Sequence, residues 1–201
     1  MATQGCWKPV VYTVMLSGVV LGAILLLGQP GVQRPRGNAM NDTCFTVDHV
    51  RLATDKLFEE VAKAFERQLG RFEPDVYKSL ATSGDTEGVR AKIEAMAGSS
   101  GLMLFGTQDH GALLRLAGQK RKAIQYVVGN PLFALQMTQH DIRASLYAPL
   151  RVLLFENEEE KTCIEYDKPS SQFGQFGNAE IDAVAAMLDR KLEALVAGAF
   201  E

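Results

Sequence analysis

The most continuous apolar stretch of the chain lies near its N-terminus. Residues 10–27 carry no charge, and as a helix they would cover about 27 Å, close to the thickness of a bilayer core. Gly28 and Pro30 follow directly, and both residue types commonly end a helix. No well-placed signal-peptidase site follows the stretch. The pattern therefore predicts an uncleaved, single-pass transmembrane anchor at residues 1–28.

A polar segment separates this apolar run from the rest of the chain. Residues 29–42 are rich in glycine, proline, asparagine and arginine, a composition typical of a flexible tether. We expect residues 43–201 to form one folded domain, since about 160 residues suffice for one core. Lys8 and the α-amino group before the apolar run nearly balance Arg34 and Arg36 after it, so the positive-inside rule hardly decides the orientation, and we expect the domain outside the cytoplasm. Gly18 and Gly22 would allow two anchors to pack as a homodimer, although chance explains this spacing more often.

Beyond residue 43, strand-like patterns alternate with amphipathic helical ones. Apolar residues predict strands at residues 45–52, 102–108, 123–128, 151–156 and 161–166. Helical periodicity predicts helices at residues 54–69 with Thr54 as N-cap, at 86–97, at 112–116, from Pro131 to residue 139, and between Asn178 and Gly198. The short acidic turn between the last two strands indicates a hairpin. This order predicts an α+β fold, with helices packed on a mostly antiparallel sheet and preceded by one N-terminal transmembrane helix.

Composition and charge exclude several classes of protein. An apolar content of 47% with 22% charged residues is typical of a globular chain, and not of collagen, a disordered tail or a multi-span transporter. The formal net charge is −3, and the positive residues near the N-terminus leave the predicted domain more acidic than the whole chain. We therefore expect no nucleic acid partner.

The three cysteines are far apart and form no C-x-x-C pair. Their spacing predicts neither a disulfide framework nor a thiolate zinc site. Cys163 falls in a predicted strand and is expected to be a small buried apolar residue. A disulfide between Cys163 and Cys44 stays open at this point.

Several short phrases occur in one order along the predicted domain. They are Asp109-His110, Gly118, Gly129-Asn130-Pro131, Met137-Thr138, Ala148-Pro149-Leu150-Arg151-Val152, Phe155-Glu156, and Tyr166-Asp167 with Pro169. Over residues 45–169 this order resembles the "domain of unknown function 302" family. The resemblance implies a small α+β domain and little biochemistry, because the function of the family is itself unsettled. Leu132 and Ala134 depart from the usual lysine and Thr-Pro-Leu-Met phrase, so no role of that lysine transfers.

The chain contains no recognisable catalytic motif. G-x-S-x-G, a Cys/His arrangement and the glycine-rich phosphate loops are all absent from the sequence, so whether the protein is an enzyme stays open. Residues 118–122 form a basic loop that could hold an anion, although a solvated loop is the commoner outcome. No cofactor and no metal can be named from these patterns.

Five residues are the candidates for a ligand-binding site. Asp109 and His110 end one predicted strand, and Asn130 ends the next, so we expect these side chains to lie together at the strand ends. Met137 and His140 are three residues apart and could add a thioether and an imidazole, which suit copper or haem. The alternative for each residue is structural: a hydrogen-bonded His110, an Asn130 that bonds its own turn, a core Met137 and an exposed His140.

Two functions from different classes fit the sequence. The first is a membrane-tethered domain that binds a small ligand, a metal or a protein partner without catalysis. The alternative is a small enzyme or redox-linked factor that uses His110 and Asn130 in a pocket. A deep pocket with His110 exposed inside it would favour the enzyme or a ligand-binding version of the first function.

Overall fold

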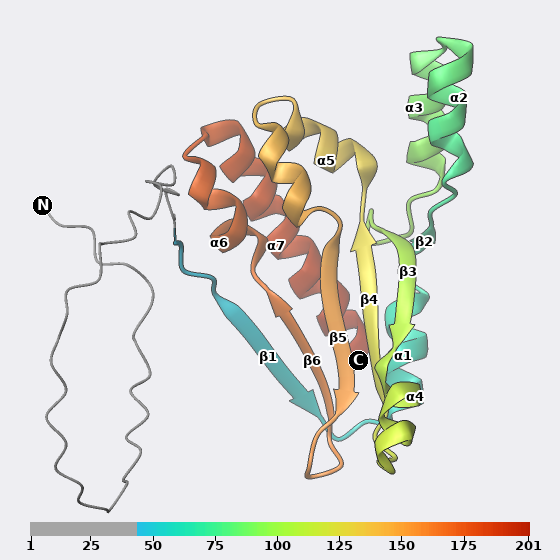
Figure 1. Ribbon diagram of the computed structural model, residues 1–201, viewed down its shortest axis with the longest axis vertical. Coiled ribbons are helices and arrows are strands. Elements are labelled where there is room, and N and C mark those ends of the chain that lie inside the picture. Colours follow the sequence, from blue (N-terminus) through green and yellow to red (C-terminus); the bar gives the residue numbers. More distant parts are fainter. Residues whose placement is uncertain (1–43) are drawn as a thin grey trace, which may run out of the picture. The chain divides into compact units, whose positions relative to one another are not determined.

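A six-stranded sheet runs through the part of the chain that the computed structural model describes, residues 44–201 (Figure 1). The strands are β1 (His49–Thr54), β2 (Gly70–Arg71), β3 (Met103–Asp109), β4 (Ala123–Gly129), β5 (Leu150–Glu156) and β6 (Thr162–Asp167), in the spatial order β1-β6-β5-β4-β3-β2. Only β2 pairs with its neighbour in parallel; the other pairs are antiparallel. The expected α+β fold is confirmed, with a mixed sheet. The predicted anchor at residues 1–28 and the predicted tether at residues 29–42 lie outside the described residues.

Helices and short 3₁₀ turns connect the strands. They are α1 (Phe58–Glu66), α2 (Asp75–Ser83), α3 (Thr86–Ala95), α4 (His110–Leu114), η1 (Arg115–Ala117), α5 (Pro131–Thr138), η2 (Ile142–Tyr147), α6 (Pro169–Phe173), η3 (Gly174–Phe176) and α7 (Ala179–Phe200). Within residues 44–201, none of these helices combines the length and hydrophobicity needed to cross a bilayer.

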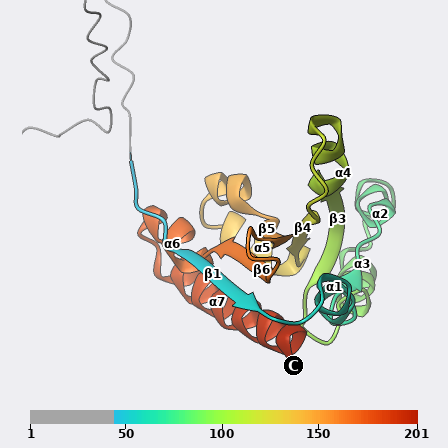
Figure 2. The same ribbon diagram turned by 90° about the horizontal axis from the view of Figure 1, so that it is seen from below.

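The main core lies on one face of the sheet and includes buried residues of α1, α5, α6 and α7. Along β5, Leu150, Val152 and Leu154 are buried, whereas Arg151 is exposed, as expected for a sheet that is covered on one side. α7 and α1 contact one another, and Figure 2 shows both on one side of the sheet, with α4 projecting from the other. The core therefore leaves the second face of β5 open.

The last helix matches its sequence pattern closely. The Oδ1 atom of Asn178 accepts hydrogen bonds from the backbone N–H groups of Glu180 and Ile181, at 3.1 and 3.0 Å, so the predicted N-cap is confirmed. The predicted apolar stripe is buried; its members include Ile181, Ala185, Leu188, Leu192 and Leu195. The expected end at Gly198 is wrong, because the helix continues to Phe200 and buries Ala199 in the core.

The first predicted helix begins later than its sequence pattern suggested. Thr54 is the last residue of β1 and pairs with Thr162, so its backbone belongs to the sheet. Leu57 takes the N-cap position of α1 and makes no side-chain capping bond. The prediction of Thr54 as N-cap was wrong because strand pairing extends β1 by two residues beyond the predicted strand.

A helical hairpin made of α2 and α3 stands away from the sheet (Figure 1). It has a small core of its own, formed by Phe72, Val76, Val89, Ile93 and Met103. The hairpin returns to β2 through a close backbone approach, since a Cβ added at Gly70 would lie 1.7 Å from the carbonyl oxygen of Met96. Only glycine fits there. The two-residue strand β2, which this approach positions against β3, was not predicted.

Candidate functional site

The two turns expected to form one site lie at opposite ends of the sheet. β3 and β4 are antiparallel: Asp109 pairs with Ile124, whereas Met103 pairs with Gly129. At about 3.3 Å per residue, these two ends are separated by about 20 Å. The prediction that Asp109-His110 and Gly129-Asn130-Pro131 lie together is therefore wrong, because two consecutive antiparallel strands finish at opposite ends of the sheet.

At one end of β3, Asp109 starts the short helix α4. Its Oδ1 atom accepts a hydrogen bond of 2.8 Å from the backbone N–H of Ala112, which is the geometry of an N-cap. His110, the next residue, is half-buried, and its imidazole forms no hydrogen bond or ion pair with any residue that the structure describes. Asp109 thus has a clear structural role, whereas the side chain of His110 has no polar partner among the described residues.

At the opposite end of the sheet, both polar atoms of the Asn130 side chain are occupied. Oδ1 accepts a 2.9 Å hydrogen bond from the backbone N–H of Leu132, and Nδ2 donates a 2.9 Å hydrogen bond to the carbonyl oxygen of Gly101. The first bond caps α5, and the second ties this turn to the loop before β3. Since the residue is buried, this arrangement favours the structural alternative for Asn130.

Met137 and His140 do not form a pair of ligands. Met137 is buried in the main core, while His140 is exposed and its ring contacts the side chain of Gln139. Among the described residues, no group of three or more His, Cys, Asp or Glu side chains is arranged to hold a metal ion. A site built from the thioether of Met137 and the imidazole of His140 has no geometric support.

A narrow apolar pocket lies beside Met137. Its volume is about 90 Å³, and its walls include Phe105, Asn130, Phe133 and Pro149. Sites for small molecules usually occupy roughly 300 to 1,000 Å³. This pocket is too small for such a ligand, although it collects residues from several of the family phrases.

A larger and more open cavity lies at the α4 end of the sheet, with a volume of about 580 Å³. We call it the cationic cavity; it is lined by Phe58, Asp109, Gly111, Arg115, Gly118, Gln119, Lys120, Arg121, Lys122, Ala123 and Ile124. Four of these side chains are cationic, and the carboxylate of Asp109 is the one anionic group in the lining. The predicted basic loop at residues 118–122 thus forms one wall of a real concavity.

The four cations of the cationic cavity differ in their partners. The Nζ atom of Lys122 lies 2.6 Å from a carboxylate oxygen of Glu59 and 3.1 Å from one of Glu156. These two hydrogen bonds raise the pKa of Lys122, and the bond to Glu59 lowers the pKa of that carboxyl group. The Nη2 atom of Arg121 lies 3.3 Å from the Oε1 atom of Glu158.

Arg115 and Lys120 are the two cations of this cavity that remain available. Both side chains are exposed, and neither forms an ion pair or hydrogen bond with a residue in the described part of the chain. An anion that enters the cavity would therefore meet the guanidinium of Arg115 and the ammonium group of Lys120 without displacing an existing partner.

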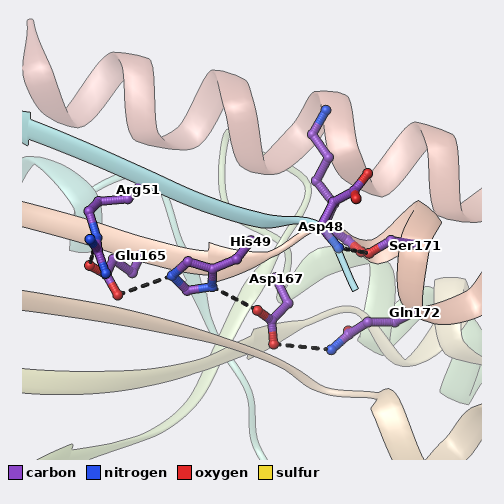
Figure 3. A network of polar contacts seen from close by, with 8 residues as sticks. Asp48, His49, Arg51, Glu165, Asp167, Ser171 and Gln172 are labelled. Carbon is purple, nitrogen blue, oxygen red and sulfur yellow. Dashed lines mark hydrogen bonds and ion pairs between the residues drawn. The ribbon is translucent and has the colours of Figure 1, made fainter. Parts of the chain in front are cut away.

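A second polar arrangement lies on the edge of the sheet, between β1 and β6 (Figure 3). The Nδ1 atom of His49 lies 2.9 Å from Oδ1 of Asp167, and its Nε2 atom lies 3.1 Å from Oε2 of Glu165. Arg51 binds the other oxygen of Glu165. Asp167 in turn accepts a weak hydrogen bond of 3.5 Å from Gln172.

The strand register explains this chain of contacts. His49 pairs directly with Asp167, and Arg51 pairs directly with Glu165. The two residues on each strand are two positions apart, so all four side chains lie on the same face of the sheet. Hydrogen bonds to Asp167 and then to Glu165 raise the pKa of His49. The network stabilises an edge strand, and it lies on an exposed face rather than in a cavity of ligand size. Sequence reasoning missed it because the partners are separated by more than a hundred residues.

These features define a small α+β domain whose sheet is covered on one face and which has a basic concavity at one end of that sheet. The chain belongs to the family described as "Domain of unknown function DUF302", whose model matches residues 78–199. The match begins later and extends further than the resemblance suggested, since it includes α7.

A solved structure supports the fold. It is described as the crystal structure of an uncharacterized conserved DUF302 protein from Bacillus stearothermophilus, with a TM-score of 0.52 and 14% sequence identity. The comparison covers 75% of this chain and 96% of that one. Comparison with curated proteins found no match. At this identity the likeness concerns the fold alone.

Proposed function

We propose that this protein is a non-catalytic binding domain, tethered to a membrane by residues 10–27, and that the cationic cavity takes a small anionic ligand. One observation carries the choice of ligand: Arg115 and Lys120 line an open cavity of about 580 Å³ and have no partner among the described residues. The tether rests on the uncharged, bilayer-length run in the sequence.

Charge and size support an anion in this cavity. The whole chain is acidic, with a formal net charge of −3. Arg115 and Lys120 have no carboxylate partner among the described residues, so these two cations attract an anion that the remaining surface repels. The volume falls within the range of roughly 300 to 1,000 Å³ that small-molecule sites occupy. Phosphate and carboxylate groups are the natural partners, because Arg115 can bind either one through two parallel hydrogen bonds.

The lining favours binding over catalysis. It contains no serine, cysteine or histidine, the usual nucleophiles and general bases of hydrolytic sites. Its one carboxylate, Asp109, already caps α4. The alternative of an enzyme built on His110 and Asn130 loses its support, since these two residues lie at opposite ends of β3 and β4.

Pyrophosphate is a suitable probe of the cavity. We would titrate it into the purified full-length chain in detergent, at constant ionic strength, and measure binding by calorimetry. The double variant Arg115→Gln/Lys120→Gln should bind at least tenfold more weakly than the wild type. Lys92→Gln on α3, which removes one exposed cation elsewhere, should bind as the wild type does.

Two results would contradict the proposed ligand class. One is the absence of pyrophosphate binding by the wild type, and the other is equal affinity of the wild type and the double variant. Matching thermal unfolding curves for all variants would show that the changes act on the ligand and not on the fold, since the replaced side chains are exposed.

A further inference from the structure

Large apolar side chains are exposed at the end of the sheet opposite the cationic cavity. Ile142 and Leu146 of η2 are 72% and 79% exposed, Leu135 of α5 is 45% exposed, and Phe45, which precedes β1, is 39% exposed. We call these four residues the apolar end. A group of exposed apolar residues at one end of a domain can form a contact surface. Leu113 and Leu116 at the α4 end are also exposed, at 61% and 89%, so the choice between the two ends rests on where the chain enters the domain.

The fold brings the segments that carry these four residues together from distant parts of the chain. α5 and η2 contact one another, and the ring of Phe45 packs edge-on against that of Tyr147, with centroids 5.9 Å apart. Tyr147 is the last residue of η2. The apolar end therefore includes the first residue of the folded unit that spans residues 45–201.

Strand register places the cationic cavity at the other end. β1 starts at His49, which pairs with Asp167, and β5 starts at Leu150, which pairs with Val128 just before α5. The cavity instead includes Ala123, at the start of β4. Figure 1 shows the same division, with α5 and the start of β1 toward the upper end of the sheet and α4 at its lower end. A length of about 20 Å separates the two ends.

The position of the apolar run in the sequence indicates what covers the apolar end. Only residues 28–44 separate that run from Phe45. As a flexible chain, seventeen residues span about 23 Å on average and at most about 58 Å when fully extended. A bilayer that holds residues 10–27 is therefore always within reach of Phe45 and its neighbours.

We propose that the apolar end rests on the surface of the same bilayer that holds the anchor, with Ile142 and Leu146 inserted at the level of the headgroups. This inference depends on the proposed membrane tether and adds an orientation to it. Arg143 lies between the two apolar residues in η2, and its exposed guanidinium can remain among the headgroups while they insert. The cationic cavity then faces away from the membrane, toward ligands in solution.

A second copy of the chain is a weaker explanation of the same surface. A stable interface buries roughly 800 Å² per partner, and four partly exposed side chains provide much less. A lipid surface has no such requirement, because each inserted side chain contributes separately and the anchor already removes most of the entropic cost of association.

Depth-dependent quenching of tryptophan tests the proposed orientation. The chain has one tryptophan, Trp7, so the full-length protein with Trp7→Phe provides a background without fluorescence from tryptophan. Leu146→Trp adds a probe at the apolar end, and Leu116→Trp adds a matched probe at the α4 end, where Leu116 is 89% exposed. Both variants would be reconstituted in phosphatidylcholine vesicles with and without brominated acyl chains.

We expect brominated lipid to quench Leu146→Trp at least threefold more strongly than Leu116→Trp. Equal quenching, stronger quenching of Leu116→Trp, or no quenching of either probe would overturn the orientation. Flotation of the same samples separates the two proposals. A chain that floats with the vesicles but shows no quenching at position 146 retains its tether and contradicts only the docking; a chain that does not float contradicts both.

Discussion

The imidazole of His49 lies between β1 and β6 with its Nδ1 atom 2.9 Å from Oδ1 of Asp167. Its second nitrogen faces Glu165 at 3.1 Å. Both nitrogens can donate to these carboxylates only when both carry a proton, so the contacts favour the imidazolium form. They raise the pKa of His49, with the hydrogen bond to Asp167 as the largest cause. A protonated His49 therefore helps to hold the edge strand β1 on the sheet.

This contact predicts a pH-dependent difference between the wild type and His49→Gln. Because the folded pKa is raised above the ordinary value of about 6.5, the stabilisation is fully present below about pH 6.5 and is lost as pH rises through the folded pKa. The effect should not exceed about 1 kcal/mol, since the pair is exposed to solvent. Denaturant titration from pH 5.5 to pH 9 measures it, and a difference that does not change with pH would contradict the assignment.

Burial of the α7 stripe predicts a large effect of Leu188→Ala. Leu188 of α7 is buried in the main core, so the substitution should lower the free energy of unfolding by about 2 to 5 kcal/mol. Arg190→Ala, on an exposed position of the same helix, is the control and should change it by less than about 0.5 kcal/mol. Equal effects of the two substitutions in a denaturant titration would show that α7 is peripheral.

The two hydrogen bonds of Asn130 predict a graded series of stabilities. Asn130→Ala removes both the cap of α5 and the bond to Gly101, and should cost about 1 to 3 kcal/mol. Asn130→Ser retains a capping oxygen but loses the donor to Gly101, so its loss should be smaller. If Asn130→Ala left the unfolding free energy unchanged, the side chain would be free for a ligand instead.

The apolar run at residues 10–27 predicts that the chain stays in the membrane fraction after extraction with carbonate. Leu21→Asp should reduce this retention, because a carboxylate near the middle of a bilayer costs about 2.5 to 3.5 kcal/mol on insertion scales. Leu21→Ala is the control and should be retained. Recovery of a shortened, soluble wild-type chain would contradict the uncleaved anchor.

The elements with local signals were predictable from the sequence. The cap at Asn178 and the apolar stripe after it belong to one helix, so the interactions that define α7 lie within a few residues of one another. The β5–β6 hairpin is also local, since Asn157 and its neighbours close a short turn between the two strands. In both cases the residues that make the structure are neighbours in the chain, and their pattern is sufficient.

The elements that depend on distant partners were not predictable in the same way. β2 is a two-residue strand because it lies against β3, and nothing in its own residues indicates a strand. The end of β1 at Thr54 depends on pairing with Thr162. The cationic cavity was visible in the sequence only as a basic loop, because its concavity also requires α4 and Phe58 from the start of α1.

The positions of the candidate site residues relative to one another could not be predicted from the sequence. By itself, the sequence determined the helix of α7, the hairpin, the membrane-length run and the family phrases, because caps, periodicity and turn residues act over a few positions. Only the tertiary structure decided that β3 and β4 are antiparallel neighbours, which separates Asp109 from Asn130 and joins His49 to Asp167. Pairing of this kind depends on which distant apolar faces share one core, and no local pattern specifies that choice.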